Sequence, residues 1–306
     1  MSAPTQTPFF SLSRTLVLAG NTFTQLLRMK VVYFLLIFLV LALAVNLLRL
    51  PHTMGPESAG AEELRMLKGP MAGAMKMFSV LLAIAATALV IPRDLEDRTL
   101  YTILAKPVPR LDYLLGKLLG VLFLILGGLV VMSLILNIVL HFRTQMVLEE
   151  LMNWAEFRGW SAETIAHERG NILRHGPTLS LQAGLATIFM ESAIMAAIAL
   201  LISTFSSSTL FTIVLTTLVY FIGNLIAEGR QYWLEESALG DSALVRIPSS
   251  IISVIFPDLR LYGVLDAAVG GETIPGVLIL KLCGLTTIYV GLYTVLAWFV
   301  FSDKEI

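Results

Sequence analysis

Long apolar runs alternate with shorter polar segments along this chain. Six of the runs approach or exceed the roughly 20 residues that an α-helix needs to cross a bilayer. The predicted membrane-spanning helices cover residues 31–50, 71–91, 113–140, 179–204, 210–227 and 275–301. Uniform runs of this kind favour helices, because the strands of a membrane barrel would alternate over about 10 residues. We therefore expect an all-α integral membrane protein with six transmembrane helices, forming a single domain over residues 1–306.

The polar segment before the first run has helical periodicity. One face of the helix predicted over residues 12–29 carries the apolar side chains of Leu12, Leu16, Ala19, Phe23 and Leu27. The other face carries Arg14, Asn21, Gln25 and Arg28. Such a segment is typical of an amphipathic helix that lies in the membrane interface, so residues 1–30 are predicted to be a cytoplasmic interfacial segment.

Lysine and arginine near the predicted helix ends indicate the orientation. The first 30 residues carry Arg14, Arg28 and Lys30 without an acidic residue, and the loop over residues 93–112 is also basic. The positive-inside rule places both segments, and with them both termini, on the cytoplasmic side of the cell membrane. Residues 141–178 and 228–274 are then extracytoplasmic. Within 145–175 we expect two short helices that are broken at Gly159, with Ser161 as the N-cap of the second.

The composition excludes several classes of protein. Apolar residues make up 57% of the chain and charged residues 14%, which is far from the balance of a soluble enzyme. A net charge of -1 gives no basic excess for binding nucleic acid. Cys283 is the single cysteine, and no spacing of histidines and acids indicates a metal site, so no metal or cofactor is expected.

The segment after the second run has the pattern of a short amphipathic helix. Asp94 is placed to cap it, Asp97 follows three residues later, and Pro107 and Pro109 end it. Leu95, Thr99, Ile103 and Leu104 share roughly one face. Such a helix under the membrane suits docking to a soluble partner, and the alternative is an ordinary solvated loop.

The same segment resembles the signature of type-2 ABC transporter permeases. It reads DLEDRTLYTILAKPVPR from Asp94 to Arg110 and continues with Leu-Leu-Gly-Lys at 114–117. Residues 21–28 and 256–270 agree with the family as well, and the subgroup that the chain resembles contains the permeases of nitrous-oxide-reductase maturation and of gliding motility. Arg98 departs from the pattern, because many members have glycine before the threonine.

The resemblance implies a half-transporter that works with a second permease subunit, identical or homologous, and with two copies of a separate ATPase. The helix after the second span would be the coupling helix that docks in the ATPase. Its candidate docking residues are Asp94, Glu96, Asp97, Arg98, Thr99, Leu100, Ile103, Leu104 and Pro107. The chain has no G-x-x-x-x-G-K-[ST] phosphate loop, so it is not expected to be an enzyme, and ATP hydrolysis belongs to the partner. Export is the usual direction in the family, and the substrate stays unidentified.

Few residues inside the predicted spans carry chemistry. Glu191 lies near the middle of the fourth span, where it is a substrate contact, a proton site or a hydrogen-bonded lock between helices. Lys281 either pairs with it or extends to the interface, as Lys117 is expected to do. Gly116 and Gly120 have the spacing of a close helix contact and are candidates for dimer packing. A stand-alone channel or a membrane-embedded enzyme is the alternative function.

Overall fold

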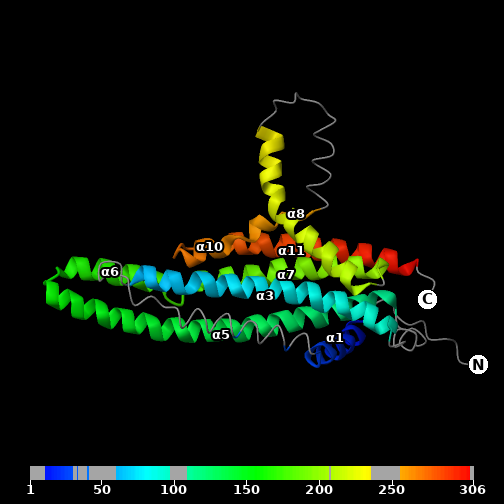
Figure 1. Ribbon diagram of the computed structural model, residues 1–306, viewed down its shortest axis with the longest axis horizontal. Helices are drawn as coiled ribbons and strands as arrows, with labels where there is room; N and C mark the ends of the chain where they lie inside the picture. The colour runs from blue at the N-terminus through cyan, green and yellow to red at the C-terminus, as the bar shows by residue number, and fades with distance from the viewer. Residues whose placement is uncertain are drawn as a thin grey trace, which may run out of the picture.

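The computed structural model describes residues 11–29, 33, 40, 60–96, 109–206, 208–235 and 256–303. Its helices are α1 (Leu12–Leu27), α3 (Ala61–Glu96), α5 (Arg110–Arg158), α6 (Ala162–His175), α7 (Leu179–Phe205), α8 (Thr209–Glu235), the 3-10 helix η2 (Leu259–Tyr262), α10 (Val264–Val269) and α11 (Gly276–Ser302). α3, α5, α7 and α11 form a long bundle, with α1 against α5 near one end and α6 at the other (Figure 1). We call these the α1 end and the α6 end.

Five stretches of the described residues are long and apolar enough to cross a membrane. They are α3, α5, the segment formed by α6 and α7, α8 and α11, so the chain is a multi-pass membrane protein. Five of the six predicted spans are thereby found as helices. The other, residues 31–50, lies outside the described residues apart from positions 33 and 40.

Two of the helices are longer than their apolar runs. α3 starts at Ala61 and continues through Pro92 to Glu96, whereas the span predicted from the sequence covers residues 71–91 only. α5 has 49 residues and therefore extends for about 74 Å, more than twice the thickness of a hydrocarbon core. The expectation of a separate short helix from residue 145 is wrong, because residues 141–158 contain neither glycine nor proline and continue α5 as far as Gly159.

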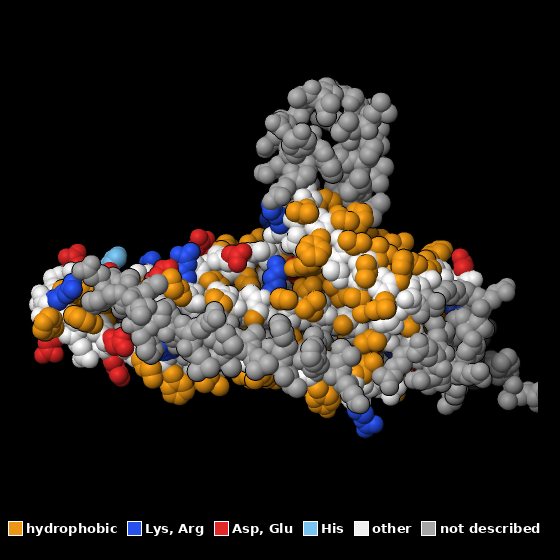
Figure 2. Space-filling model, in the orientation of Figure 1, with side chains coloured by type: hydrophobic (Ala, Val, Ile, Leu, Met, Phe, Trp, Pro, Cys, Tyr) orange, Lys and Arg blue, Asp and Glu red, His pale blue; other side chains and the backbone are white. Residues whose placement is uncertain are grey.

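The turn between α5 and α6 has the predicted chemistry. Gly159 ends α5 with a φ of 63°, a left-handed conformation that glycine adopts without strain. Ser161 caps α6 by accepting a hydrogen bond from the Thr164 backbone N–H. Charged side chains gather over this end of the molecule, whereas the middle of the visible face is mostly hydrophobic (Figure 2). The hairpin of α5 and α6 thus has the polarity of a segment outside the membrane.

α7 is the central helix of the bundle and packs against α3, α5, α8, α10 and α11. Its middle is lined by buried alanines, which allow neighbouring helices to come close. η2 and α10 also pack on α7, with Leu259 and Tyr262 buried. Part of the predicted outer loop 228–274 is therefore folded against the bundle, and α8 itself continues to Glu235.

Candidate functional site

Buried polar side chains join α3 to α5 at the α1 end. Asp94 is only 3% exposed, and its Oδ2 accepts a hydrogen bond of 2.7 Å from the Tyr113 hydroxyl. The Lys117 ammonium lies 2.7 Å from the same oxygen. The prediction that Asp94 caps a separate helix is wrong, because this residue lies within α3. Its carboxylate instead locks α3 against α5.

Lys117 does not extend to the interface as predicted. Its side chain is buried, lies over the Tyr113 ring and reaches within 3.5 Å of the Gln25 side-chain oxygen in α1. The sequence around Lys117 does not predict its partner, because Asp94 belongs to a different helix. A buried ion pair of this kind fixes geometry, since removing one partner leaves the other charge uncompensated.

Two further contacts fix the start of α5. Asp112 is buried, pairs with Arg14 of α1 at 2.9 Å and accepts a hydrogen bond from the Ser11 backbone N–H. Arg110 donates hydrogen bonds to the backbone carbonyls of Phe301 and Ser302 at the end of α11. The carbonyl end of a helix carries partial negative charge, so an arginine there is stabilising.

These contacts surround the predicted coupling segment. Residues 97–108 lie outside the described residues, and with them Asp97, Arg98, Thr99, Leu100, Ile103, Leu104 and Pro107. The backbone of Glu96 ends α3, and its side chain is also outside the description. The end of α3 and the start of α5, which flank this segment, are bonded to each other. The start of α5 is also bonded to α1 and to α11. A force on the segment would therefore reach four helices.

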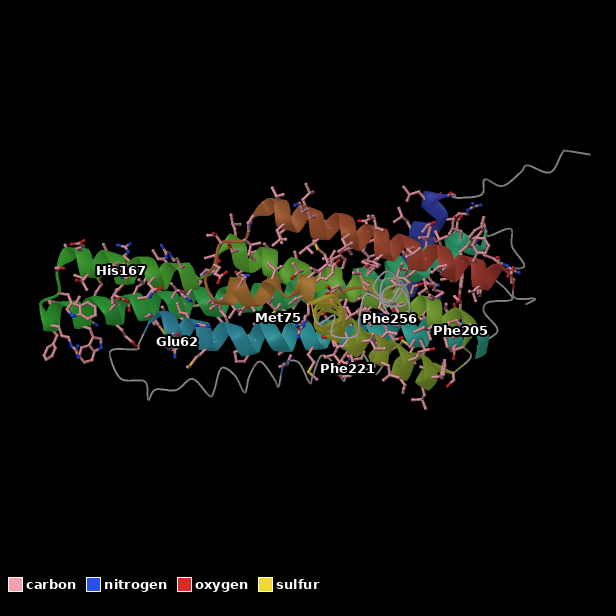
Figure 3. All side chains as sticks on the ribbon, turned by 90° about the horizontal axis from the view of Figure 1, so that it is seen from above. Glu62, Met75, His167, Phe205, Phe221 and Phe256 are labelled. Carbon is pink, nitrogen blue, oxygen red and sulfur yellow. The ribbon has the colours of Figure 1, made fainter. Side chains whose placement is uncertain are left out.

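A third ion pair lies near the middle of the bundle. Lys76 of α3 lies 3.0 Å from the Glu191 carboxylate of α7, with side-chain exposures of 26% and 1%. Lys76 is one residue after Met75, which Figure 3 places between Glu62 and the far end of α3. Lys281, the predicted partner, is exposed on α11. The sequence analysis missed Lys76, although a lysine inside an apolar run was a visible signal.

Gly116 and Gly120 face α1 of the same chain. A Cβ at Gly116 would lie 2.5 Å from the Leu18 Cβ, and one at Gly120 would lie 2.6 Å from the Thr22 Cβ. Only glycine allows the two helices to come so close. α1 of the same chain therefore occupies the surface of these two glycines, which the sequence analysis proposed for dimer packing.

Comparison with known proteins gives a family for this arrangement. A family model described as "ABC-2 family transporter protein" matches residues 16–262, which run from α1 to the end of η2. Among curated protein sequences, none matches the chain. The match covers most of the chain and includes the predicted coupling segment together with the Asp94–Lys117 and Lys76–Glu191 ion pairs. The chain therefore belongs to the ABC-2 family of transporter proteins.

Proposed function

We propose that this chain is the permease subunit of an ATP-driven exporter whose energy comes from a separate ATPase. The family makes it a membrane transport component of an ABC transporter. The proposal adds that the ATPase docks on residues 95–107, since the predicted docking residue Asp94 is buried against α5. It also adds that two ATPase copies serve two permease subunits, and that both termini face the cytoplasm. The subgroup of nitrous-oxide-reductase maturation and gliding-motility permeases stays a prediction from resemblance.

The observation that carries the proposal is that the two helix ends flanking residues 97–108, the end of α3 and the start of α5, are bonded to each other. A coupling segment can transmit movement only when its two ends are firmly attached to the helices that must move. The Asp94–Lys117 ion pair joins α3 to α5, and the Arg14–Asp112 pair joins α5 to α1. Arg110 extends the connection to α11. This arrangement supports a segment that receives force from outside the membrane.

Replacing Leu100 and Leu104 with aspartate tests the docking site. Both leucines belong to the predicted coupling helix, and a carboxylate in an apolar contact carries a large desolvation cost. We expect the tagged variant to insert into the membrane normally and to lose the co-purifying ATPase activity. The measurement is ATP hydrolysis in the eluate, together with identification of the associated P-loop protein by mass spectrometry.

Leu173→Asp is the matched control. Leu173 is an exposed leucine on α6, at the opposite end of the bundle, so this variant should retain the ATPase. Undiminished association in the Leu100→Asp/Leu104→Asp variant would contradict the docking assignment. Loss of association in both variants would point to a general defect of assembly instead.

A further inference from the structure

Three buried hydrogen-bond donors near the α6 end have no hydrogen-bond partner. They are the Lys68 Nζ, the Arg143 Nε and the Thr144 Oγ1. Lys68 is 0% exposed and Thr144 is 4% exposed. Most buried polar groups in folded proteins are hydrogen-bonded, so a group of unsatisfied donors at one end of a bundle requires an explanation.

Thr144 differs from the other threonines in this respect. Thr87, Thr216 and Thr286 each donate from Oγ1 to the backbone carbonyl four residues earlier, at 2.7 to 2.8 Å. This local bond satisfies a threonine hydroxyl inside an apolar helix bundle. Thr144 is buried in the same kind of helix without making it, so its hydroxyl is available to another acceptor.

Arg143 and Thr144 are neighbours on α5 and lie at the junction where α5 meets the first turns of α3 and the turn between α6 and α7. Arg143 pairs with Glu63 at 2.8 Å, which sets the first turns of α3 beside α5. A Cβ at Gly176, in the turn after α6, would lie 3.3 Å from the Thr144 Oγ1. Lys68 shares the buried face of α3 with Leu64. Long side chains on a helix point back toward its N-terminus, so the Lys68 ammonium is directed toward the level of Glu63.

The two acidic residues in the first turn of α3 are already paired with other cations. Glu63 pairs with Arg143, and Glu62 lies 4.0 Å from Arg65. No carboxylate within the described ranges pairs with Lys68, and desolvation of an isolated ammonium is costly. Among the described residues, this end of the bundle therefore holds a buried ammonium without a carboxylate partner and two further unsatisfied donors. That is the chemistry of an anion site.

We propose that this junction binds a phosphate group, held by Lys68 with help from Thr144 and Arg143. A tetrahedral oxyanion can accept from an ammonium, a hydroxyl and a guanidinium N–H at the same time, and such charge-assisted bonds are strong. The phosphate belongs either to the headgroup of an anionic lipid or to a soluble ligand. This site is separate from the Lys76–Glu191 pair, which has its own counter-charge. Phosphate binding at this site also does not depend on the proposed transport mechanism.

The test uses the full-length protein, with any partner that co-purifies, in dodecyl maltoside, a detergent without phosphate. Thermal unfolding is followed during titration with inorganic phosphate, with phosphatidylglycerol in mixed micelles, and with sodium chloride at equal ionic strength. We expect one or both phosphate probes to raise the melting temperature, and chloride to leave it unchanged. A response to phosphatidylglycerol alone identifies a lipid headgroup, and a response to inorganic phosphate identifies a soluble ligand.

Variants of the donors decide the assignment. Lys68→Met keeps the length of the side chain and should weaken the apparent affinity for the effective probe by about tenfold to a hundredfold, as for the loss of a charge-assisted hydrogen bond. Thr144→Val keeps the shape and should weaken it less. Arg65→Met is the matched control, because Arg65 is an exposed cation one turn away and its loss should not change the affinity.

Three outcomes would overturn the proposal. The first is a wild-type protein that responds to neither phosphate probe. The second is an equal response to chloride, which would show general screening of charge. The third is a phosphate response that survives in both Lys68→Met and Thr144→Val. Because two different donors are changed, poor folding of one variant still leaves the other to decide.

Discussion

Lys76 and Glu191 form an ion pair near the middle of α3 and α7, and the Glu191 carboxylate is almost fully buried. A charge in the middle of a bilayer is expensive unless it is paired. We therefore propose that Glu191 is one half of an ion-pair lock between two central helices. Lys76 is the more exposed residue of the pair. Replacing Lys76 and replacing Glu191 are therefore expected to change the free energy of unfolding by different amounts.

A double-mutant cycle measures the lock. Lys76→Met leaves the Glu191 carboxylate buried without its partner and should lower stability by about 3–5 kcal/mol. Adding Glu191→Gln removes the uncompensated charge and should restore most of the loss. Melting temperatures in detergent provide the measurement.

Lys281→Met is the control for this cycle, because Lys281 is exposed on α11 and should be replaceable at little cost. If the double variant melted as low as Lys76→Met alone, the two residues would not be energetically coupled. The structural interpretation of Glu191 would then be lost.

The amphipathic helix α1 packs one face against α5 and leaves another face exposed. The buried face of α1 is formed by Thr15, Ala19, Thr22 and Leu26, whereas Leu12 and Leu16 are exposed. The small residues meet the glycines of α5, and the larger apolar side chains are left to face outward. An exposed apolar face next to a packed small-residue face is what an interfacial helix needs in order to contact both protein and lipid.

Gly120→Ala tests this contact. The new Cβ would lie 2.6 Å from the Thr22 Cβ and 2.8 Å from the Ala19 carbonyl oxygen, so α1 must move away. We expect a loss of about 1–3 kcal/mol, as for other overpacked contacts, and faster trypsin cleavage at Arg14 and Arg28. Limited proteolysis followed by mass spectrometry detects the cleavage.

Gly127→Ala provides the comparison within the same helix. A Cβ at Gly127 would have no atom within 4 Å, so alanine should be neutral or slightly stabilising there. Equal effects of the two substitutions would show that the α1 contact contributes nothing beyond helix propensity.

At the scale of the whole molecule, the length of α5 constrains the orientation. A helix of about 74 Å that begins beside α1 must leave the hydrocarbon core before it reaches α6. Figure 3 places Glu62 and His167 toward the α6 end and Phe205 toward the other end. If the α1 end is cytoplasmic, the hairpin of α5 and α6 stands outside the cell membrane.

Cysteine labelling in intact cells checks this orientation. In a Cys283→Ala background, single cysteines at Ser58, Ser161 and Ser242 should react with an impermeant maleimide. A cysteine at Thr102 should react only after permeabilisation, because the positive-inside rule places its loop in the cytoplasm. Labelling of Thr102 without permeabilisation would reverse the proposed topology.

The amino-acid sequence was sufficient to predict which segments form membrane helices and where several of them begin or end. Apolar run length identified α7 and α11 almost to the residue, and local turn chemistry identified Gly159 and Ser161. These features depend on neighbours in the chain, so a single sequence contains them. Where helicity continued into polar sequence, as in α3 and α5, hydropathy alone underestimated the helix.

Only the tertiary structure decided which polar residues meet. Lys117 with Asp94, Lys76 with Glu191 and Gly120 with Thr22 each join different helices. Their pairing depends on the rotation and offset of one helix against another, which side-chain periodicity does not specify. The unsatisfied donors near Lys68 were invisible for the same reason, since a missing partner can be recognised only when all neighbours are in place.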